Sequence, residues 1–243
     1  YDKGLPMRIC LTFMYLINLN VYASLIDLGK ENPNLAGLIY DTKQDLTWVK
    51  DANLAKTLSS PYADKNGLMS WESTIEWVDT LTIAGYNDWR VPSVSPMDVI
   101  QPSDCPFNGG NCGYNVDTTN SELAFLWHEI LGNKAYFDVN GNPEQLGWGL
   151  TSISSGNVQF INMIADNYWL DVKNEPGGNS FNLGDGYQIG SYYGMPNVNF
   201  NTMVLRTGRA SVDVNAPPTF LLLLLLFMFL LNFRNKNKLI KNE

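Results

Sequence analysis

Ala84-Gly85-Tyr86-Asn87-Asp88-Trp89-Arg90-Val91-Pro92 is the stretch of the 243-residue chain that says most about its fold. Gly85 is suited to the left-handed conformation that ends a helix, and Pro92 is suited to halting a short strand that starts at Asp88. Upstream, Ser70 is a natural N-cap for a helix from Trp71 to about Gly85. The apolar residues of that helix follow the i, i+4, i+7 spacing of a buried stripe, namely Trp71, Ile75, Val78 and Leu81 or Thr82.

The flanking segments predict further short elements. Residues 37–41 and 44–49 read as two strands around a polar turn, and Thr119-Asn120-Ser121-Glu122 fits a capping box that starts a second helix. The apolar face of that helix is Leu123, Leu126, Trp127 and Ile130, and Gly132 ends it. From Ala135 to Arg206, short apolar runs alternate with Asn-Gly, Gly-Asn and Gly-Gly turns. The sequence therefore predicts a single α+β domain with two helices and many short antiparallel strands.

The charge of the chain limits its partners. The formal net charge is -8, but six of the basic residues lie at the two ends, so residues 24–214 carry 22 acidic and 10 basic side chains. A domain with a net charge near -12 repels phosphate backbones. We therefore predict that the chain does not bind nucleic acid, and no motif in it calls for a cofactor.

Three cysteines occur in the sequence. Cys10 lies in an apolar N-terminal stretch, whereas Cys105 and Cys112 flank a turn that contains Pro106, Gly109 and Gly110. Zinc is less well supported there, because C-x6-C offers no second pair of ligands. We predict a Cys105–Cys112 disulfide, which also fits an exported protein.

The N-terminal region has the pattern of an export signal. Arg8 precedes about ten apolar residues, and Val21-Tyr22-Ala23 offers small side chains at positions 21 and 23 for cleavage. We predict a signal peptide over 7–23 and a linker over 24–35; a short buried helix is the alternative for the apolar stretch.

A second apolar segment lies at the C-terminus. Phe220 to Leu231 is an unbroken run of twelve apolar residues, followed by Arg234, Lys236, Lys238 and Lys241. At about 1.5 Å per residue this run reaches roughly 18 Å, short of the about 30 Å hydrocarbon core of a bilayer. We expect a short hydrophobic transmembrane helix over 220–233 and a basic cytoplasmic tail over 234–243, either cleaved off after export or kept as an anchor.

These C-terminal features resemble a known class of sorting signal. A proline-containing motif, a short apolar helix and a basic end together resemble the bacterial PEP-CTERM signals, although Ala216-Pro217-Pro218-Thr219 stands where Pro-Glu-Pro-Ser/Thr is usual. The resemblance implies a linker and sorting motif over 212–219, an exosortase-type processing enzyme as partner, and a cell-envelope or extracellular location.

The central domain resembles the Lcl C-terminal domain family. The resemblance rests on residues 37–41 with Leu46-Thr47-Trp48, on Trp71 followed by residues 84–92, and on Ser121-Glu122-Leu123 and Val204-Leu205-Arg206. Residues 167–169 and 185–188 look like later segments of the family, while Leu170-Asp171 departs from its small hydroxyl residues. The resemblance covers about 36–209 and implies a C-type-lectin-like fold, with no settled activity, for a domain over 36–211.

Two groups of residues are candidate binding sites. Trp89 and Arg90 are suited to stacking on a sugar ring, or more simply to holding the edge of the core. Asp138, Asn140, Asn142 and Glu144 place four oxygen side chains at alternate positions, as a calcium loop does, but Gly141 and Pro143 favour an ordinary Asn-Gly turn.

No catalytic constellation is recognisable. His128 is the only histidine and lies on a predicted helix, and the chain has neither G-x-S-x-G nor HExxH. We therefore expect an exported, non-catalytic binding module for extracellular polysaccharide or another surface component. The alternatives are a structural surface protein without a small ligand and a glycan-active enzyme with an unrecognised site.

Overall fold

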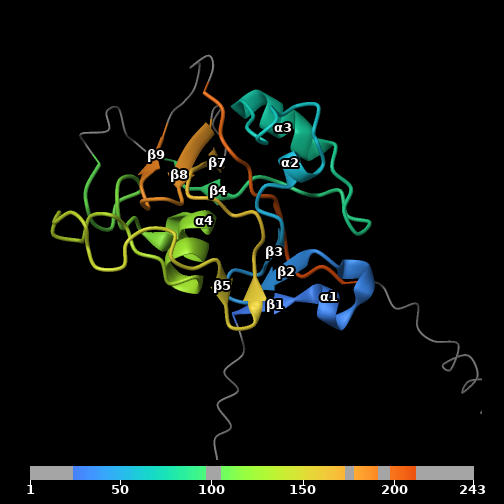
Figure 1. The fold of residues 1–243 in the computed structure, drawn as a ribbon, viewed down its shortest axis with the longest axis horizontal. Coiled ribbons are helices and arrows are strands. Elements are labelled where there is room, and N and C mark those ends of the chain that lie inside the picture. Colours follow the sequence, from blue (N-terminus) through green and yellow to red (C-terminus); the bar gives the residue numbers. More distant parts are fainter. Residues whose placement is uncertain (1–23, 97–104, 173–177, 191–197, 212–243) are drawn as a thin grey trace, which may run out of the picture.

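The computed structural model describes residues 24–96, 105–172, 178–190 and 198–211. They form a mixed α+β domain built on two four-stranded sheets and one small hairpin (Figure 1). This agrees with the predicted fold class. The residues predicted to form a signal peptide (7–23) and a sorting motif (216–219), and the apolar segment at 220–233, all lie outside the described residues. None of the helices in the described ranges has the length and apolar composition of a membrane span.

The first sheet has the order β1-β2-β3-β10, and all its neighbouring strands are antiparallel. Its strands are β1 (Leu25–Asp27), β2 (Leu38–Asp41), β3 (Leu46–Val49) and β10 (Leu205–Thr207). The predicted hairpin over 37–49 is confirmed, with the Asp41 carboxylate accepting hydrogen bonds from the Lys43 and Gln44 amides in the turn. Leu25 pairs with Asp41, Asp41 with Leu46, and Leu46 with Thr207. The first and last strands of the described domain are therefore the two opposite edge strands of this sheet, and Leu25 and Thr207 lie in the same cross-strand row.

The second sheet has the order β4-β7-β8-β9, with one parallel pair between β4 and β7. Its strands are β4 (Ser93–Val94), β7 (Asn167–Val172), β8 (Gly178–Asn182) and β9 (Gln188–Ile189). A separate hairpin joins β5 (Ser154–Ser155) and β6 (Val158–Gln159).

Alternating side chains divide the interior into two clusters. Ile39 and Trp48 enter one cluster with Trp127, Tyr168 and Phe181, while Leu38 and Val49 enter the other with Trp77, Trp89 and Trp169. Successive side chains of a strand point to opposite faces, so a sheet with apolar residues at both sets of positions is covered on both sides. This explains why all four residues of β3 are buried.

Residues 24–35 are part of the domain, which corrects the predicted linker. They form β1, helix α1 (Leu28–Glu31) and a 3₁₀ turn, η1 (Pro33–Leu35). Leu25, Leu28 and Leu35 are buried. The run from Gly29 to Asn34 is polar, which suggested a linker. Polar side chains here cap the short turns instead: Asp27 accepts a hydrogen bond from the Gly29 amide, and Asn32 accepts one from the Asn34 amide.

Further helices are α2 (Leu54–Thr57), α3 (Trp71–Asp79), α4 (Glu122–Phe125) and the π-helical turn η4 (Leu126–Ile130), which follows a 3₁₀ turn, η3 (Thr118–Asn120). The two predicted helices, α3 and α4, begin near the predicted positions but are short, and α2 was not predicted. Ser70 caps α3 as predicted, by accepting from the Ser73 amide. Ser121, rather than Thr119, caps α4 by accepting from the Ala124 amide.

Helix α3 ends six residues before Gly85, which corrects the predicted end. Ala84 and Gly85 both have positive φ angles, and Ile83 and Tyr86 exchange backbone hydrogen bonds across them. This is the geometry of a two-residue hairpin turn, which requires φ > 0 at both central residues. The buried face of the helix is also rotated from the prediction: Thr74, Trp77 and Val78 are buried, while Trp71 and Ile75 are only partly buried.

The predicted strand from Asp88 to Pro92 is reduced to one bridge between Arg90 and Leu205. Strand β4 starts directly after Pro92, at Ser93. Proline has no amide hydrogen to donate, and the Ser93 amide donates to the Glu122 carboxylate rather than to a neighbouring strand.

Candidate functional site

Trp89 and Arg90 lie at the edge of the core, as the simpler interpretation predicts. Trp89 is buried and its Nε1–H donates to the Tyr86 carbonyl at 2.9 Å. The Arg90 guanidinium donates to both carboxylate oxygens of Glu122, each at 2.7 Å. Trp89 is therefore part of the core, and the guanidinium of Arg90 is bound to Glu122.

The rest of the motif ties the last strand to the domain. Asp88 accepts two hydrogen bonds from Arg206, at 2.8 and 2.9 Å, and the Arg206 guanidinium lies 4.1 Å from the centre of the Tyr86 ring. Tyr86 Oη donates to the Ser211 carbonyl and accepts from the Ser211 amide. The stretch from Tyr86 to Arg90 thus holds residues 206–211, the last described segment, against the domain.

The proposed calcium loop is an Asn-Gly turn. Asp138 accepts hydrogen bonds from the Asn140 amide, the Asn142 amide and the Asn142 side chain, at 2.8–2.9 Å. These bonds hold the pKa of Asp138 below its usual value. Gly141 has a positive φ, as the turn requires. Within the described ranges, no three His, Cys, Asp or Glu side chains come together as metal ligands would.

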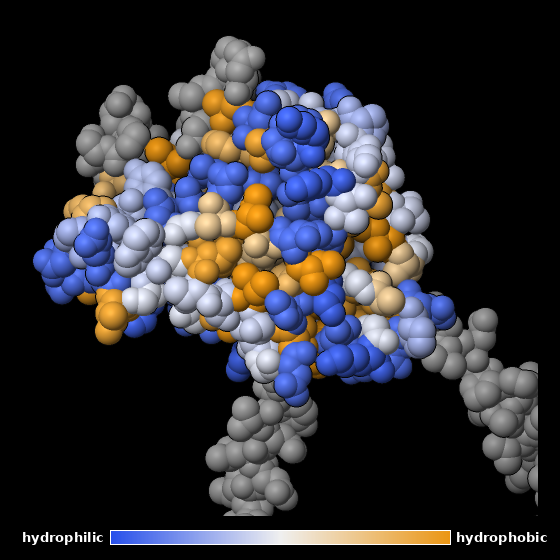
Figure 2. All heavy atoms as spheres, viewed as in Figure 1, coloured by the Kyte–Doolittle hydropathy of each residue, from blue (hydrophilic) through white to orange (hydrophobic). Residues whose placement is uncertain are grey.

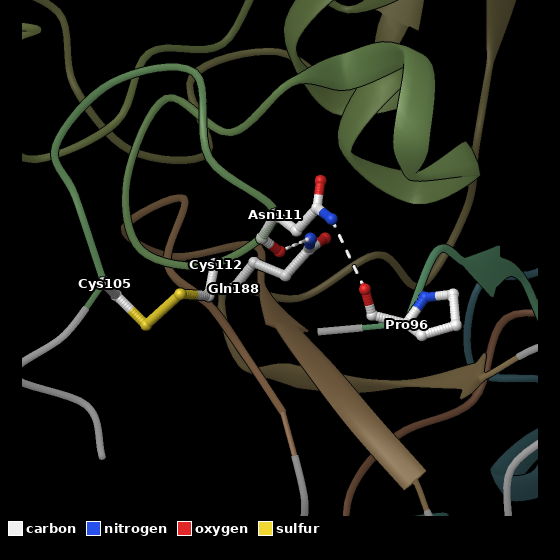
Figure 3. The surroundings of a disulfide bond; sticks show 5 residues. All are labelled: Pro96, Cys105, Asn111, Cys112 and Gln188. Atoms are coloured by element: carbon white, nitrogen blue, oxygen red, sulfur yellow. Dashed lines mark hydrogen bonds between the residues drawn. A yellow bond between two sulfur atoms is a disulfide. The ribbon is translucent and has the colours of Figure 1, made fainter. Parts of the chain in front are cut away.

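The Cys105–Cys112 disulfide is present, as predicted, with a Cα–Cα distance of 5.2 Å. Buried Gln188 connects its loop to the second sheet: the Gln188 side chain donates to the Asn111 carbonyl at 2.7 Å, and its backbone pairs with Gly113 (Figure 3). Gln188 Oε1 also accepts from Ser121, the cap of α4. One buried amide therefore joins the disulfide loop, α4 and β9.

A cluster of six aromatic rings lies next to this loop and forms what we call the aromatic surface. Each ring contacts at least one other, with centroids 4.8–6.3 Å apart. Its members are Phe107, Tyr114, Tyr136, Phe137, Trp148 and Tyr187.

The aromatic surface is open to solvent at two of its members. Phe107 is 42% exposed and Trp148 is 41% exposed, and the aliphatic side chains Val139 and Leu146 on the intervening loop are 54% and 92% exposed. Most of these residues belong to the loops coloured green to yellow at the left of Figure 1, away from the side where the described C-terminal residues lie. Figure 2 shows hydrophilic and hydrophobic residues side by side at the left of the molecule.

Amide side chains hold the backbone under these rings. Asn115 donates to the carbonyls of Phe107 and Phe137, both at 2.9 Å, and Gln145 donates to the carbonyls of Ala135 and Phe137. Gly141 packs against the Phe107 ring: a Cβ atom at this position would lie 3.1 Å from the ring. The rings are thus positioned in advance, which reduces the conformational entropy lost on binding.

The electrostatic environment of the aromatic surface is acidic. Asp138, Glu144 and Asp185 belong to its segments, against Lys134. Burial raises the pKa of Tyr114 to about 12, with the Asp185 charge adding to that effect, and burial also raises the pKa of Asp185. Tyr114 is therefore a neutral phenol at physiological pH, and the surface favours neutral or cationic ligands over anionic ones.

Sequence reasoning missed the aromatic surface. Its rings come from five separate segments, at 107, 114, 136–137, 148 and 187, and none of them shows a strand or helix period. The available signal was local composition, since aromatic residues are dense around the disulfide and the Asn-Gly turn.

His128 lies on η4, as expected for a helical residue, and contacts the Trp127 ring. Burial lowers the pKa of His128 to about 4, with a hydrogen bond to the Asn133 backbone acting in the opposite direction. A histidine that is neutral in the fold but has its ordinary pKa near 6.5 when unfolded takes up a proton on unfolding between those values.

We therefore expect the free energy of unfolding to fall as the pH is lowered from about 6.5 to 4, by at most about 1.4 kcal/mol per pH unit. Denaturant melts at several pH values measure this slope, and His128→Gln should reduce it in that window. Because His128 is the only histidine, an unchanged slope in the variant would contradict this assignment.

Comparisons with known protein families, with curated proteins and with solved structures return no match for this chain.

Proposed function

We propose that this chain is an exported, non-catalytic binding module that contacts extracellular polysaccharide, or another polysaccharide-bearing component of the cell envelope, through its aromatic surface. Six contacting rings with two solvent-open members are the observation that carries the proposal. The face of an aromatic ring carries partial negative charge and attracts the polarised C–H groups of a sugar ring. The acidic surroundings favour a neutral polysaccharide over one rich in uronic acids or sulfate.

The remaining expectations complete this proposal. The Lcl C-terminal resemblance and its C-type-lectin-like fold are compatible with a mixed α+β domain of mainly antiparallel strands. The predicted signal peptide over 7–23 and the resemblance of residues 212–243 to a PEP-CTERM signal support a location at the cell envelope or outside the cell. An exosortase-type enzyme would process the tail, and the segment at 220–233 would hold the chain in the membrane before that step.

Trp148→Ala tests the proposal. We expect the full chain to bind at least one neutral polysaccharide on a glycan array, and the variant to bind it about tenfold more weakly, because one stacked ring contributes on the order of 1.4 kcal/mol. Calcium should make no difference, since Asp138 already accepts bonds from its own loop.

Tyr62→Ala is the matched control, because Tyr62 is a solvent-exposed aromatic residue that is not part of the aromatic surface. Its affinity should stay within about twofold of the wild type. A folded chain that binds no glycan, with or without calcium, would remove the proposal and leave the structural surface protein. Equal losses in both variants would place the binding elsewhere.

A further inference from the structure

A cleft of about 590 Å³, which we call the polar cleft, lies on a different part of the domain. Helix α2 and the turn at 64–68 form one side, and the segment 162–166 that leads into β7 forms the other. Six of its lining residues are polar: Asn53, Lys56, Thr57, Asn66, Asn162 and Asp166.

One buried carboxylate organises both sides of the polar cleft. Asp51 is 8% exposed and accepts from the Asn53 amide at 3.0 Å, from Thr57 Oγ1 at 2.6 Å and from Asn162 Nδ2 at 3.0 Å. Backbone hydrogen bonds from Ala52 to Ile161 and from Ile161 to Lys50 bring the two segments together. The polar groups that line the cleft are thus fixed before any ligand arrives.

Asn162 is held in an uncommon conformation. Its φ is +55°, in the left-handed region, and it is solvent-exposed at the cleft. Its side-chain amide donates to Asp51 and to Thr57 Oγ1, so the planar amide group turns Oδ1 away from them. Asparagine adopts this region more readily than most non-glycine residues, and the two hydrogen bonds fix its side chain at the cleft.

The polar cleft offers donors and acceptors side by side. Lys56 brings an ammonium group that makes no ion pair within the described residues. Asp166 is fixed by the Asn167 amide at 2.8 Å and by Asn201 Nδ2 at 3.2 Å, and a carboxylate accepts about four hydrogen bonds. A hydroxyl group both donates and accepts, so adjacent hydroxyls match such a set.

The remaining lining residues are aliphatic. Leu68 and Ile164 give the polar cleft an apolar wall, and Ile164 is 41% exposed. Lys56 and Asp166 are the two charged residues of the lining, and their charges cancel. Such a cleft suits a neutral ligand with hydroxyls on its edges and C–H groups on one face.

We propose that the polar cleft binds one neutral pyranose unit, such as the end of a glycan chain, and that it does so independently of the aromatic surface. The proposal rests on the proposed function in taking a saccharide as the ligand. It adds a second subsite that selects a single sugar unit, while the aromatic surface contacts the polymer.

Titration of the full chain with the neutral methyl pyranosides of glucose, mannose and galactose tests the polar cleft, followed through the side-chain amide signals in NMR spectra. At least one pyranoside should saturate the wild type. Asn162→Gly, which keeps the positive φ accessible while removing the amide, should weaken binding about tenfold. Lys56→Ala should weaken it about threefold or more. Lys65→Ala should leave it unchanged, because Lys65 is an exposed lysine of the turn at 64–68 that is not among the lining residues of the cleft.

The two proposals fail separately in this experiment. Trp148→Ala should bind the pyranoside like the wild type while losing affinity for polymer. The absence of saturable pyranoside binding up to about 50 mM, a concentration far above a weak millimolar Kd, overturns the polar cleft and leaves the aromatic surface intact. Equal affinity of the wild type and Asn162→Gly also overturns it. Pyranoside binding without polymer binding retains the cleft and removes the aromatic surface.

Discussion

Replacement of Trp169 by alanine is expected to lower the free energy of unfolding by about 3–5 kcal/mol, the range for buried tryptophans. Trp169 is almost fully buried and packs against Trp71 and Phe200, with ring centroids 5.7 and 4.6 Å away. Its Nε1–H donates to the Met69 carbonyl at 2.8 Å. The substitution therefore leaves a large cavity between β7 and the start of α3, and the Met69 carbonyl loses one of its two hydrogen bonds, the other coming from the Phe200 amide.

Two comparisons make this prediction specific. Trp169→Phe keeps an aromatic ring in the core but removes the Nε1–H donor. It should therefore lower the free energy of unfolding clearly less than Trp169→Ala does. Trp148→Ala removes an equally large ring from the surface and should cost less than about 1 kcal/mol. Urea denaturation followed by circular dichroism measures all three. Similar losses for Trp169→Ala and Trp148→Ala would show that Trp169 is not a core residue.

Glu122→Ala is expected to lower the free energy of unfolding by about 2–3 kcal/mol. Its carboxylate accepts both Arg90 bonds and the Ser93 amide, each at 2.7 Å, and the Arg90 and Glu122 side chains are only 31% and 20% exposed. Removing the carboxylate leaves a half-buried guanidinium and a backbone amide without their acceptor. The link between the motif and α4 is lost with it.

Asp88→Ala is the matched control for Glu122→Ala. Asp88 makes the same two-bond contact with Arg206, and its side chain is 54% exposed. The Arg206 side chain is only 12% exposed, but its guanidinium keeps the Gly208 carbonyl and the Tyr86 ring as partners, so we expect a smaller loss of stability than for Glu122→Ala. Thermal melts of the two variants should therefore differ clearly. If Glu122→Ala unfolds no more easily than Asp88→Ala, the Arg90–Glu122 pair is not a main support of the fold.

Local patterns predicted the parts of the fold that local interactions determine. The hairpin over 37–49, the Ser70 cap and the disulfide each depend on neighbouring residues, and all three were recoverable from the sequence. The end of α3 could not be predicted from the sequence, because Gly85 suits both a helix end and a hairpin turn. Distant contacts decide between them: Tyr86 binds Ser211, which is 125 residues away.

The candidate sites lay beyond local patterns for the same reason. Trp89 and Arg90 drew attention as an aromatic ring beside a guanidinium, and their partners are a neighbouring carbonyl and Glu122, which is brought in by α4. The aromatic surface and the polar cleft each combine side chains from segments far apart in the sequence. Only the paired strands and loops of the fold bring those segments together.

The placement of β10 also determines how the domain carries tension. Its backbone is bonded to β3 on one side and to Arg90 on the other, and the hydrogen bonds of an antiparallel ladder run perpendicular to the strand. When the C-terminal segment is pulled along the strand while a ligand holds the opposite side of the domain, these bonds are loaded together in shear. The contacts of Tyr86 with Ser211 and of Asp88 with Arg206 hold residues at the C-terminal side of β10, so a force applied from that side acts on them before it reaches the core.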